Sequence, residues 1–157
     1  MKILLSILLA LSVKICYTQP QYVSLIDSAV KEIERRDILY EFDSLYTEVD
    51  KDSTIRKQIS LSFKYSDFKR RTLIMVKEIK RGNNDSSVLQ YFFKNHQLIK
   101  ICADIYSGNI TTAQQFYFNS GKLVFPDNYR SVFDVNSYIK KSKEYVALKR
   151  KTRKSQK

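Results

Sequence analysis

The residues best able to form a nucleophilic pair are one cysteine and one histidine, Cys102 and His96. His96 is the only histidine in the chain. A cysteine nucleophile needs a basic partner that lowers the pKa of its thiol. Cys102 stands in an alternating run, Ile99–Ile105, where a small buried side chain is the simpler role. We therefore interpret Cys102 as a core residue and keep the dyad with His96 as the less favoured alternative.

Other catalytic and cofactor motifs are missing from the sequence. The acids are spread along the chain, and no pair of them stands out by spacing. Asp50–Thr54 has the spaced acids of a calcium loop, but Ile55 and Leu61 replace the glycine and the acid that such a loop needs. There is no glycine-rich phosphate loop and no Cys-x-x-Cys pair. The sequence thus predicts no catalytic residue, no metal site and no cofactor, and a hydrolase whose acids converge from distant positions stays an alternative.

Aromatic residues are the other group that could hold a ligand. The chain has eleven Tyr, nine Phe and no Trp. In Val88–Phe93 and Phe116–Phe118 they occupy both faces of predicted strands, and such strands are usually covered on both faces. Burial is therefore the favoured interpretation. If one face is exposed instead, the predicted patch for a protein, peptide, glycan or lipid ligand consists of Tyr91, Phe93, Tyr117, Lys94 and Lys122.

Basic residues gather at the C-terminal end. The net charge is +12, and residues 140–157 hold nine Lys or Arg residues and one acid, so the rest of the chain is close to neutral. We expect residues 152–157 to be a disordered basic tail. A basic segment of this kind can contact anionic lipid or polymer, whereas nucleic acid is disfavoured because no nucleic-acid motif accompanies it. The predicted contact residues are Lys149, Arg150, Lys151, Arg153 and Lys154.

Residues 1–18 have the layout of a secretory signal peptide. Lys2 supplies a positive start, and the apolar run Ile3–Val13 follows it. The run is shorter than the roughly 20 apolar residues that span a bilayer. We therefore expect a secreted or periplasmic protein. Lipidation of Cys16 is a minority alternative, because Lys14-Ile15 stands where a lipoprotein signal has small residues.

Helical spacing of apolar residues begins directly after this segment. Over residues 21–36 the apolar residues recur every three or four positions, which indicates a helix. Over residues 38–49 the spacing continues in a different phase, so we expect a kinked continuation or a second short helix. Residues 134–151 return to helical spacing, with Asp134 as the N-cap.

From Ile55 onward the period becomes two, which predicts strands with one apolar and one polar face. Short connections favour sequential antiparallel pairing. The predicted fold is α+β: an N-terminal helix packed on an antiparallel meander sheet of about five to six strands, with a C-terminal helix, in a single domain over residues 19–151. The predicted strands are Ile55–Tyr65, Thr72–Lys80, Val88–Phe93, Leu98–Ile105, Ala113–Phe118 and Lys122–Phe125.

Two of the predicted hairpins share one design, 25 residues apart. Asn119-Ser120-Gly121 separates the strands of one, and Asn95-His96 separates those of the other. These residue types tolerate the positive φ of a tight hairpin turn. We interpret the echo as consecutive hairpins, since a repeat architecture needs about three copies. Residues 88–125 resemble hairpins of small exported bacterial proteins, a group without an established activity, and the resemblance implies no functional residues.

Taken together, these features favour an exported, non-catalytic binding or accessory domain of the cell envelope with an unknown ligand. Folds with a helix on a curved antiparallel sheet, cystatin-like ones among them, often bind on the concave face, and this analogy supports a binding role. One alternative is a surface-associated protein held on anionic lipid or polymer by its basic C-terminus. The other is the hydrolase described above.

Overall fold

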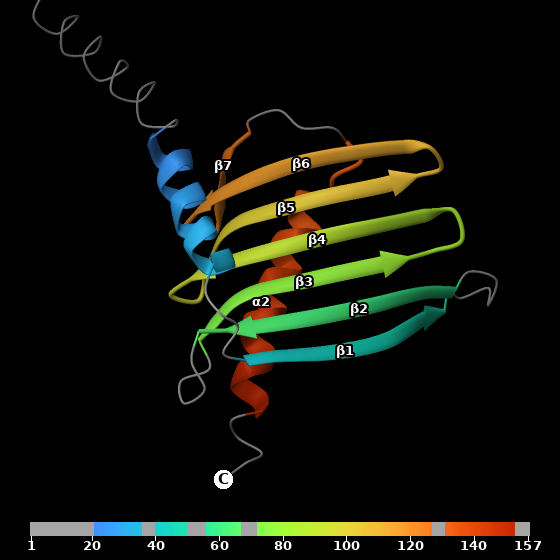
Figure 1. Ribbon diagram of the computed structural model, residues 1–157, viewed down its shortest axis with the longest axis horizontal. Helices are drawn as coiled ribbons and strands as arrows, with labels where there is room; N and C mark the ends of the chain where they lie inside the picture. Colours follow the sequence, from blue (N-terminus) through green and yellow to red (C-terminus); the bar gives the residue numbers. More distant parts are fainter. Residues whose placement is uncertain (1–20, 36–39, 50–55, 67–71, 127–130, 153–157) are drawn as a thin grey trace, which may run out of the picture.

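A computed structural model describes residues 21–35, 40–49, 56–66, 72–126 and 131–152. A helix over residues 21–35 precedes one sheet of seven antiparallel strands, and the helix α2 (Val135–Thr152) follows it (Figure 1). The strands lie in the sheet in their sequence order. The predicted meander is confirmed, with slightly more strands than expected. The strands are β1 (Tyr40–Val49), β2 (Arg56–Tyr65), β3 (Leu73–Arg81), β4 (Asp85–Lys94), β5 (Gln97–Ser107), β6 (Ile110–Asn119) and β7 (Lys122–Phe125).

The first strand, β1, occupies residues for which the sequence predicted a helix, so that prediction is wrong. Leu45 gave the segment its helical spacing, but it is 64% exposed. The true period is two, and β2 supplies a backbone partner for every residue of β1. Tyr, Phe, Thr and Val also favour strands. On one face the register pairs Tyr40 with Tyr65, Phe42 with Phe63 and Tyr46 with Ile59.

Several sequence predictions fall outside the described residues. These are the signal peptide, Cys16 and the chain beyond residue 152. Asp50–Thr54 also lies outside them, but β1 precedes it and β2 follows it, so it joins two strands and not a helix to a strand.

The helix α2 covers one face of the sheet and forms the larger core with it (Figure 1). Its first turn is capped as predicted, because the backbone N–H of Ser137 donates to Asp134 Oδ1 at 3.0 Å. Apolar and aromatic side chains from five strands meet those of α2 and its approach. The sheet contributes Ile59, Phe63, Leu73, Leu89, Tyr91, Phe93, Ile101, Phe116 and Phe118, and the helical side contributes Phe133, Val135, Tyr138 and Tyr145.

The N-terminal helix packs on the opposite face of the sheet, near one end of the strands (Figure 1). Its buried residues Ile26 and Val30 form a second, smaller cluster with Met75, Phe92 and Tyr117. The predicted packing of this helix on the sheet is therefore confirmed. Neither described helix is long and apolar enough to cross a membrane.

The strand register shifts at three places near this same end of the sheet. In β3, β5 and β7 one residue has no partner in the preceding strand: Ile74, Ile99 and Val124. These residues are spaced 25 apart, so the echo seen in two hairpins has a third member in β3. An extra residue of this kind bends a strand and increases its twist. The shifts therefore shape the end of the sheet on which the N-terminal helix lies.

The two turns singled out in the sequence are tight hairpin turns. Asn95 and His96 have φ values of 51° and 64°, and Ser120 and Gly121 have φ values of 50° and 79°. Positive φ at both central residues gives a turn whose twist matches the flanking strands. The predicted role of these residues as connectors is confirmed.

Candidate functional site

The two faces of the sheet differ in how much of them is covered. α2 runs across the long strands on its side, whereas the N-terminal helix covers only one end of the other side (Figure 1). We call the part of this second face beyond the N-terminal helix the open face. The register places it on β1 to β6.

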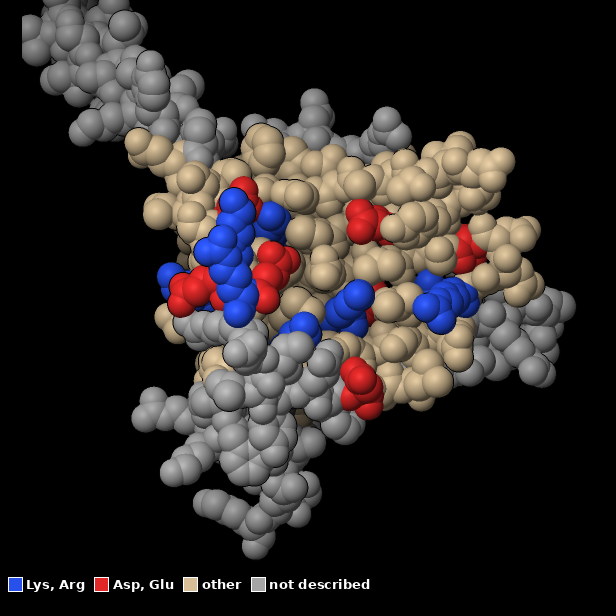
Figure 2. Space-filling model, in the orientation of Figure 1, with Lys and Arg blue, Asp and Glu red and all other residues tan. Residues whose placement is uncertain are grey.

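The open face is a mixed surface of amides, hydroxyls, charges and a few apolar side chains. Figure 2 shows that acidic and basic side chains are interspersed on it, without a field of one sign. Its side chains are half-buried or exposed, so they belong to neither core. They come from Asp43, Leu45, Ser60, Ser62, Lys77, Ile79, Val88, Gln90, Asp104, Ala113 and Gln115.

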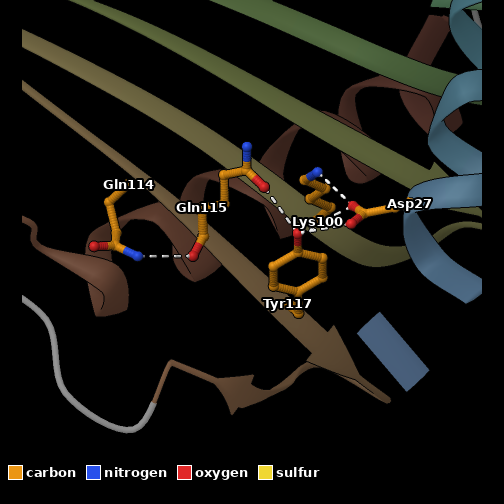
Figure 3. Close-up of polar contacts among 5 residues, drawn as sticks. All are labelled: Asp27, Lys100, Gln114, Gln115 and Tyr117. Carbon is orange, nitrogen blue, oxygen red and sulfur yellow. Dashed lines mark hydrogen bonds and ion pairs between the residues drawn. The ribbon is translucent and has the colours of Figure 1, made fainter. Parts of the chain in front are cut away.

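A polar network joins the open face to the N-terminal helix (Figure 3). Lys100 Nζ donates to Asp27 Oδ1 at 2.6 Å, which links β5 to the helix. The Tyr117 hydroxyl lies 3.0 Å from the same oxygen and 2.8 Å from Gln115 Oε1. Tyr22 adds a second link, because its hydroxyl donates to the Phe118 carbonyl at 2.8 Å. These bonds fix the helix on the sheet and define one border of the open face.

The network holds Lys100 in its charged form. Burial disfavours the ammonium, but the hydrogen bond to the Asp27 carboxylate and its negative charge outweigh burial and raise the pKa of Lys100. The ammonium also lies 5.0 Å from the centre of the Tyr117 ring. Burial, helped by the bond to Asp27, raises the pKa of Tyr117. Neither group is therefore tuned to exchange a proton near neutral pH.

The cysteine–histidine dyad does not form. Cys102 packs against the cluster under the N-terminal helix, whereas His96 lies in the turn before β5. Cys102 is six residues beyond His96 along an extended strand, a span of roughly 20 Å. Burial raises the pKa of the Cys102 thiol, and the nearby Lys100 only partly offsets this. Cys102 is thus a neutral thiol beside a core.

On the other face of the sheet, Glu78 anchors α2. Its side chain is 1% exposed, and its Oε1 lies 2.7 Å from Lys141 Nζ and 3.4 Å from Lys80 Nζ. The Tyr145 hydroxyl donates to Oε2 at 2.5 Å. Burial favours the protonated acid, but these donors and charges prevail and lower the pKa of Glu78. The buried Tyr91 hydroxyl has no hydrogen-bond partner, and burial together with the Glu78 charge raises its pKa.

Two cavities flank α2 on its face of the sheet. One, of about 330 Å³, lies between α2 and the turns that precede β5 and β7. The other, of about 280 Å³, has Lys80 and Lys141 in its wall. Both lysines already contact Glu78, and Asp85 in the same wall adds a negative charge. The second cavity therefore offers no excess charge to an ionic ligand.

The structure separates the residues of the predicted aromatic patch. Tyr91 and Phe93 are buried under α2, while Tyr117 is buried on the opposite face beside the N-terminal helix. Lys94 and Lys122 are exposed next to the hairpin turns. The three aromatic rings therefore act as core, which was the favoured interpretation, and they do not gather in one exposed groove.

The predicted contact residues of the C-terminus are only partly described. Lys149, Arg150 and Lys151 belong to the last turns of α2, but their side chains lie outside the described part of the structure. Arg153 and Lys154 lie outside it entirely. Binding of an anionic surface by these residues stays a prediction.

The hydrolase alternative gains no support from the two acids that lie between a helix and the sheet. Asp27 and Glu78 are each bound to a lysine, and they sit on opposite faces of the sheet. They cannot act on one substrate. Within the described part of the chain, no three His, Cys, Asp or Glu side chains gather as a metal site requires.

The two ion pairs that fasten the helices were not predicted from the sequence. A signal for them existed. Lys100 stands between Ile99 and Ile101, and Glu78 lies inside the strand that begins with Leu73, and both are buried in the structure. A buried charge requires a partner. The partners Asp27 and Lys141 could not be chosen, because helix residues have no register with a strand.

Comparison of the chain with models of known protein families, with curated proteins and with solved structures finds no match.

Proposed function

We propose that this protein is an exported, non-catalytic binding or accessory domain of the cell envelope, and that its ligand lies on the open face. The observation that carries the proposal is the unequal covering of the sheet. α2 closes one face with a large aromatic core, and the N-terminal helix leaves most strands of the other face uncovered. Export rests on the signal-peptide layout of residues 1–18.

The side chains of the open face favour a glycan as the ligand. Ser62, Gln90 and Gln115 offer both hydrogen-bond donors and acceptors without net charge. Ile79 and Val88 pair across β3 and β4 and add an apolar strip between them. Acidic and basic side chains are interspersed on this face (Figure 2). A neutral polymer with hydroxyls and apolar ring faces fits such a surface better than a strongly ionic ligand does.

A pull-down on insoluble polysaccharides tests the proposal. The chain from Gln19 onward is incubated with purified bacterial cell-wall sacculi, chitin and insoluble glucan, and the bound fraction is measured after centrifugation. We expect retention on at least one polysaccharide. The double substitution Ser62→Ala with Gln90→Ala should weaken retention at least fivefold, because each lost hydrogen bond is worth about 1 kcal/mol.

The matched control is Gln114→Ala. Gln114 precedes Gln115 in β6 but pairs with Ala103 and so lies on the α2 face of the sheet. Loss of the Gln114 side chain should therefore leave retention unchanged. If the wild-type chain binds none of the polysaccharides, or if the double variant binds as well as the wild type, the glycan site is refuted. Circular dichroism of each variant confirms that the fold is intact.

A second function is favoured by the basic C-terminus, which holds Lys149, Arg150, Lys151, Arg153 and Lys154. We propose that these residues hold the domain on anionic lipid. Each basic residue near an anionic membrane contributes about 1 kcal/mol. Replacing all five by Gln should therefore reduce partitioning onto vesicles with 30 mol% phosphatidylglycerol, by roughly a hundredfold or more, and 0.5 M NaCl should do the same. Unchanged, salt-independent partitioning of the substituted chain would contradict this function.

A further inference from the structure

The two edges of the sheet are built differently. β7 forms one edge, has only four residues, begins with Lys122 and is followed by Pro126. A short strand, a lysine and a proline are devices that prevent an edge from pairing with another chain. β1 forms the other edge and has ten residues. It contains no proline, glycine, lysine or arginine.

The β1 edge is also regular. All ten residues of β1 pair with β2 without a shift in register. No described strand pairs with the outer side of β1, and Figure 1 shows it at the lower border of the sheet. Alternate backbone N–H and C=O groups along about 30 Å of β1 therefore point away from the sheet, since a strand rises about 3.3 Å per residue. Such an edge is a template for an added strand.

The charge of β1 indicates what kind of added strand it can bind. The strand carries Glu41, Asp43 and Glu48 and no basic residue, in a chain whose net charge is +12. Antiparallel pairing with β1 of a second copy would place six acids in one two-stranded ribbon, and like charges across strands are destabilising. A segment rich in Lys or Arg would instead place opposite charges beside these acids.

The surroundings of β1 indicate a pattern for the added strand. Asp43 is exposed on the open face. On the opposite face, the register pairs Phe42 and Tyr46 of β1 with Phe63 and Ile59 of the α2 core, so apolar side chains of an added strand would continue that face. Side chains of a strand alternate between the two faces. Basic residues on one face and apolar or β-branched residues on the other therefore fit this position.

We propose that the outer edge of β1 binds an extended segment of a partner protein in which Lys or Arg alternates with apolar residues, by adding it to the sheet as an eighth strand. This site is distinct from the glycan surface, because it uses the backbone of the edge and binds a polypeptide.

Fluorescence anisotropy with labelled nine-residue peptides tests the proposal on the full mature chain. We expect the alternating peptide KVKTKVKTK to bind at least tenfold more tightly than EVETEVETE at 150 mM NaCl. A version with N-methyl groups on alternate amides cannot donate the ladder hydrogen bonds and should lose binding at least tenfold. Hydrogen exchange of the β1 amides should slow when the unmodified basic peptide is bound.

Charge reversal provides the matched pair of variants. Asp43→Lys should weaken binding of the basic peptide at least fivefold and strengthen binding of the acidic one. Asp104→Lys is the control, because Asp104 lies on the same face in β5, four strands and roughly 19 Å from β1. Each of three results would overturn the proposal: equal binding of basic and acidic peptides, undiminished binding of the N-methylated peptide, or a dimer of the chain alone in light scattering with protected β1 amides.

Discussion

At the scale of single residues, two carboxylates fasten the two helices to opposite faces of the sheet. Asp27 binds Lys100 under the N-terminal helix, and Glu78 binds Lys141 under α2. The Asp27 side chain is 37% exposed, while that of Glu78 is 1% exposed. Removing one partner of a buried ion pair is far more costly than removing a solvated one. α2 should therefore depend on its ion pair more than the N-terminal helix does.

Replacing Glu78 by Gln tests this dependence. The change leaves the Lys141 ammonium beside the core without its counter-charge, and we expect a loss of about 3–5 kcal/mol in the free energy of unfolding. Urea denaturation followed by circular dichroism measures it. Glu144→Gln is the control, because it removes the same charge from an exposed position of α2 and should cost less than about 0.5 kcal/mol. Equal losses in the two variants would contradict the anchoring role of Glu78.

The pH dependence of stability gives a second readout of the same carboxylate. The pKa of Glu78 is lower in the folded chain than its ordinary value. Its contribution is therefore complete above the ordinary pKa of a glutamate and is lost as the pH falls through the folded pKa. The wild-type chain should lose more stability than Glu78→Gln does between neutral pH and the acidic range below the ordinary glutamate pKa.

At the scale of elements, the strands with clean alternation were predictable and β1 was not. From Ile55 to Phe125 every predicted strand is present, because one face of each strand packs under α2 and apolar residues must recur with period two. In β1, Leu45 and the pair Tyr46 and Val49 mimic a helical stripe. Only pairing with β2 decides between the helical and the strand pattern, and the sequence of a short segment does not reveal its pairing partner.

The register shifts show what a sequence echo can and cannot reveal. Two hairpins were recognised by their spacing of 25 residues, but the third member, at Ile74, follows a longer connection between β2 and β3. What the three share is a leucine directed to the α2 core, followed by the extra residue: Leu73-Ile74, Leu98-Ile99 and Leu123-Val124. The common cause is the bend of the sheet end and not a repeated site.

The candidate site was less predictable than the fold. The aromatic content of the strands suggested Tyr91, Phe93 and Tyr117 as ligand-binding residues. Large aromatic side chains are usually buried in the core, and all three are buried here. The open face consists instead of Ser, Gln and Ala, a few aliphatic side chains and scattered charges. Such residues carry no sequence signal for binding. They become a candidate surface only once the position of the N-terminal helix shows which end of the sheet is left uncovered.

At the scale of the whole molecule, one sheet separates a closed side from an open side. α2 and the aromatic residues beneath it provide most of the buried apolar surface. The smaller cluster under the N-terminal helix holds that helix at one end. The side chains on the rest of the second face therefore belong to neither core, and they are available to a ligand.

Thiol labelling of two alanine positions measures this difference most directly. Ala113 is exposed on the open face, and Ala103, on the neighbouring strand, is 0% exposed under α2. Each is changed to Cys in the mature chain that carries Cys102→Ser, and the rate of reaction with a maleimide is compared with that of the unfolded chain. We predict that Ala113→Cys reacts within about tenfold of the unfolded rate and that Ala103→Cys reacts at least a hundredfold more slowly, since opening the core costs several kcal/mol. Equal protection at both positions, or faster labelling at Ala103→Cys, would contradict the account of one closed and one open face.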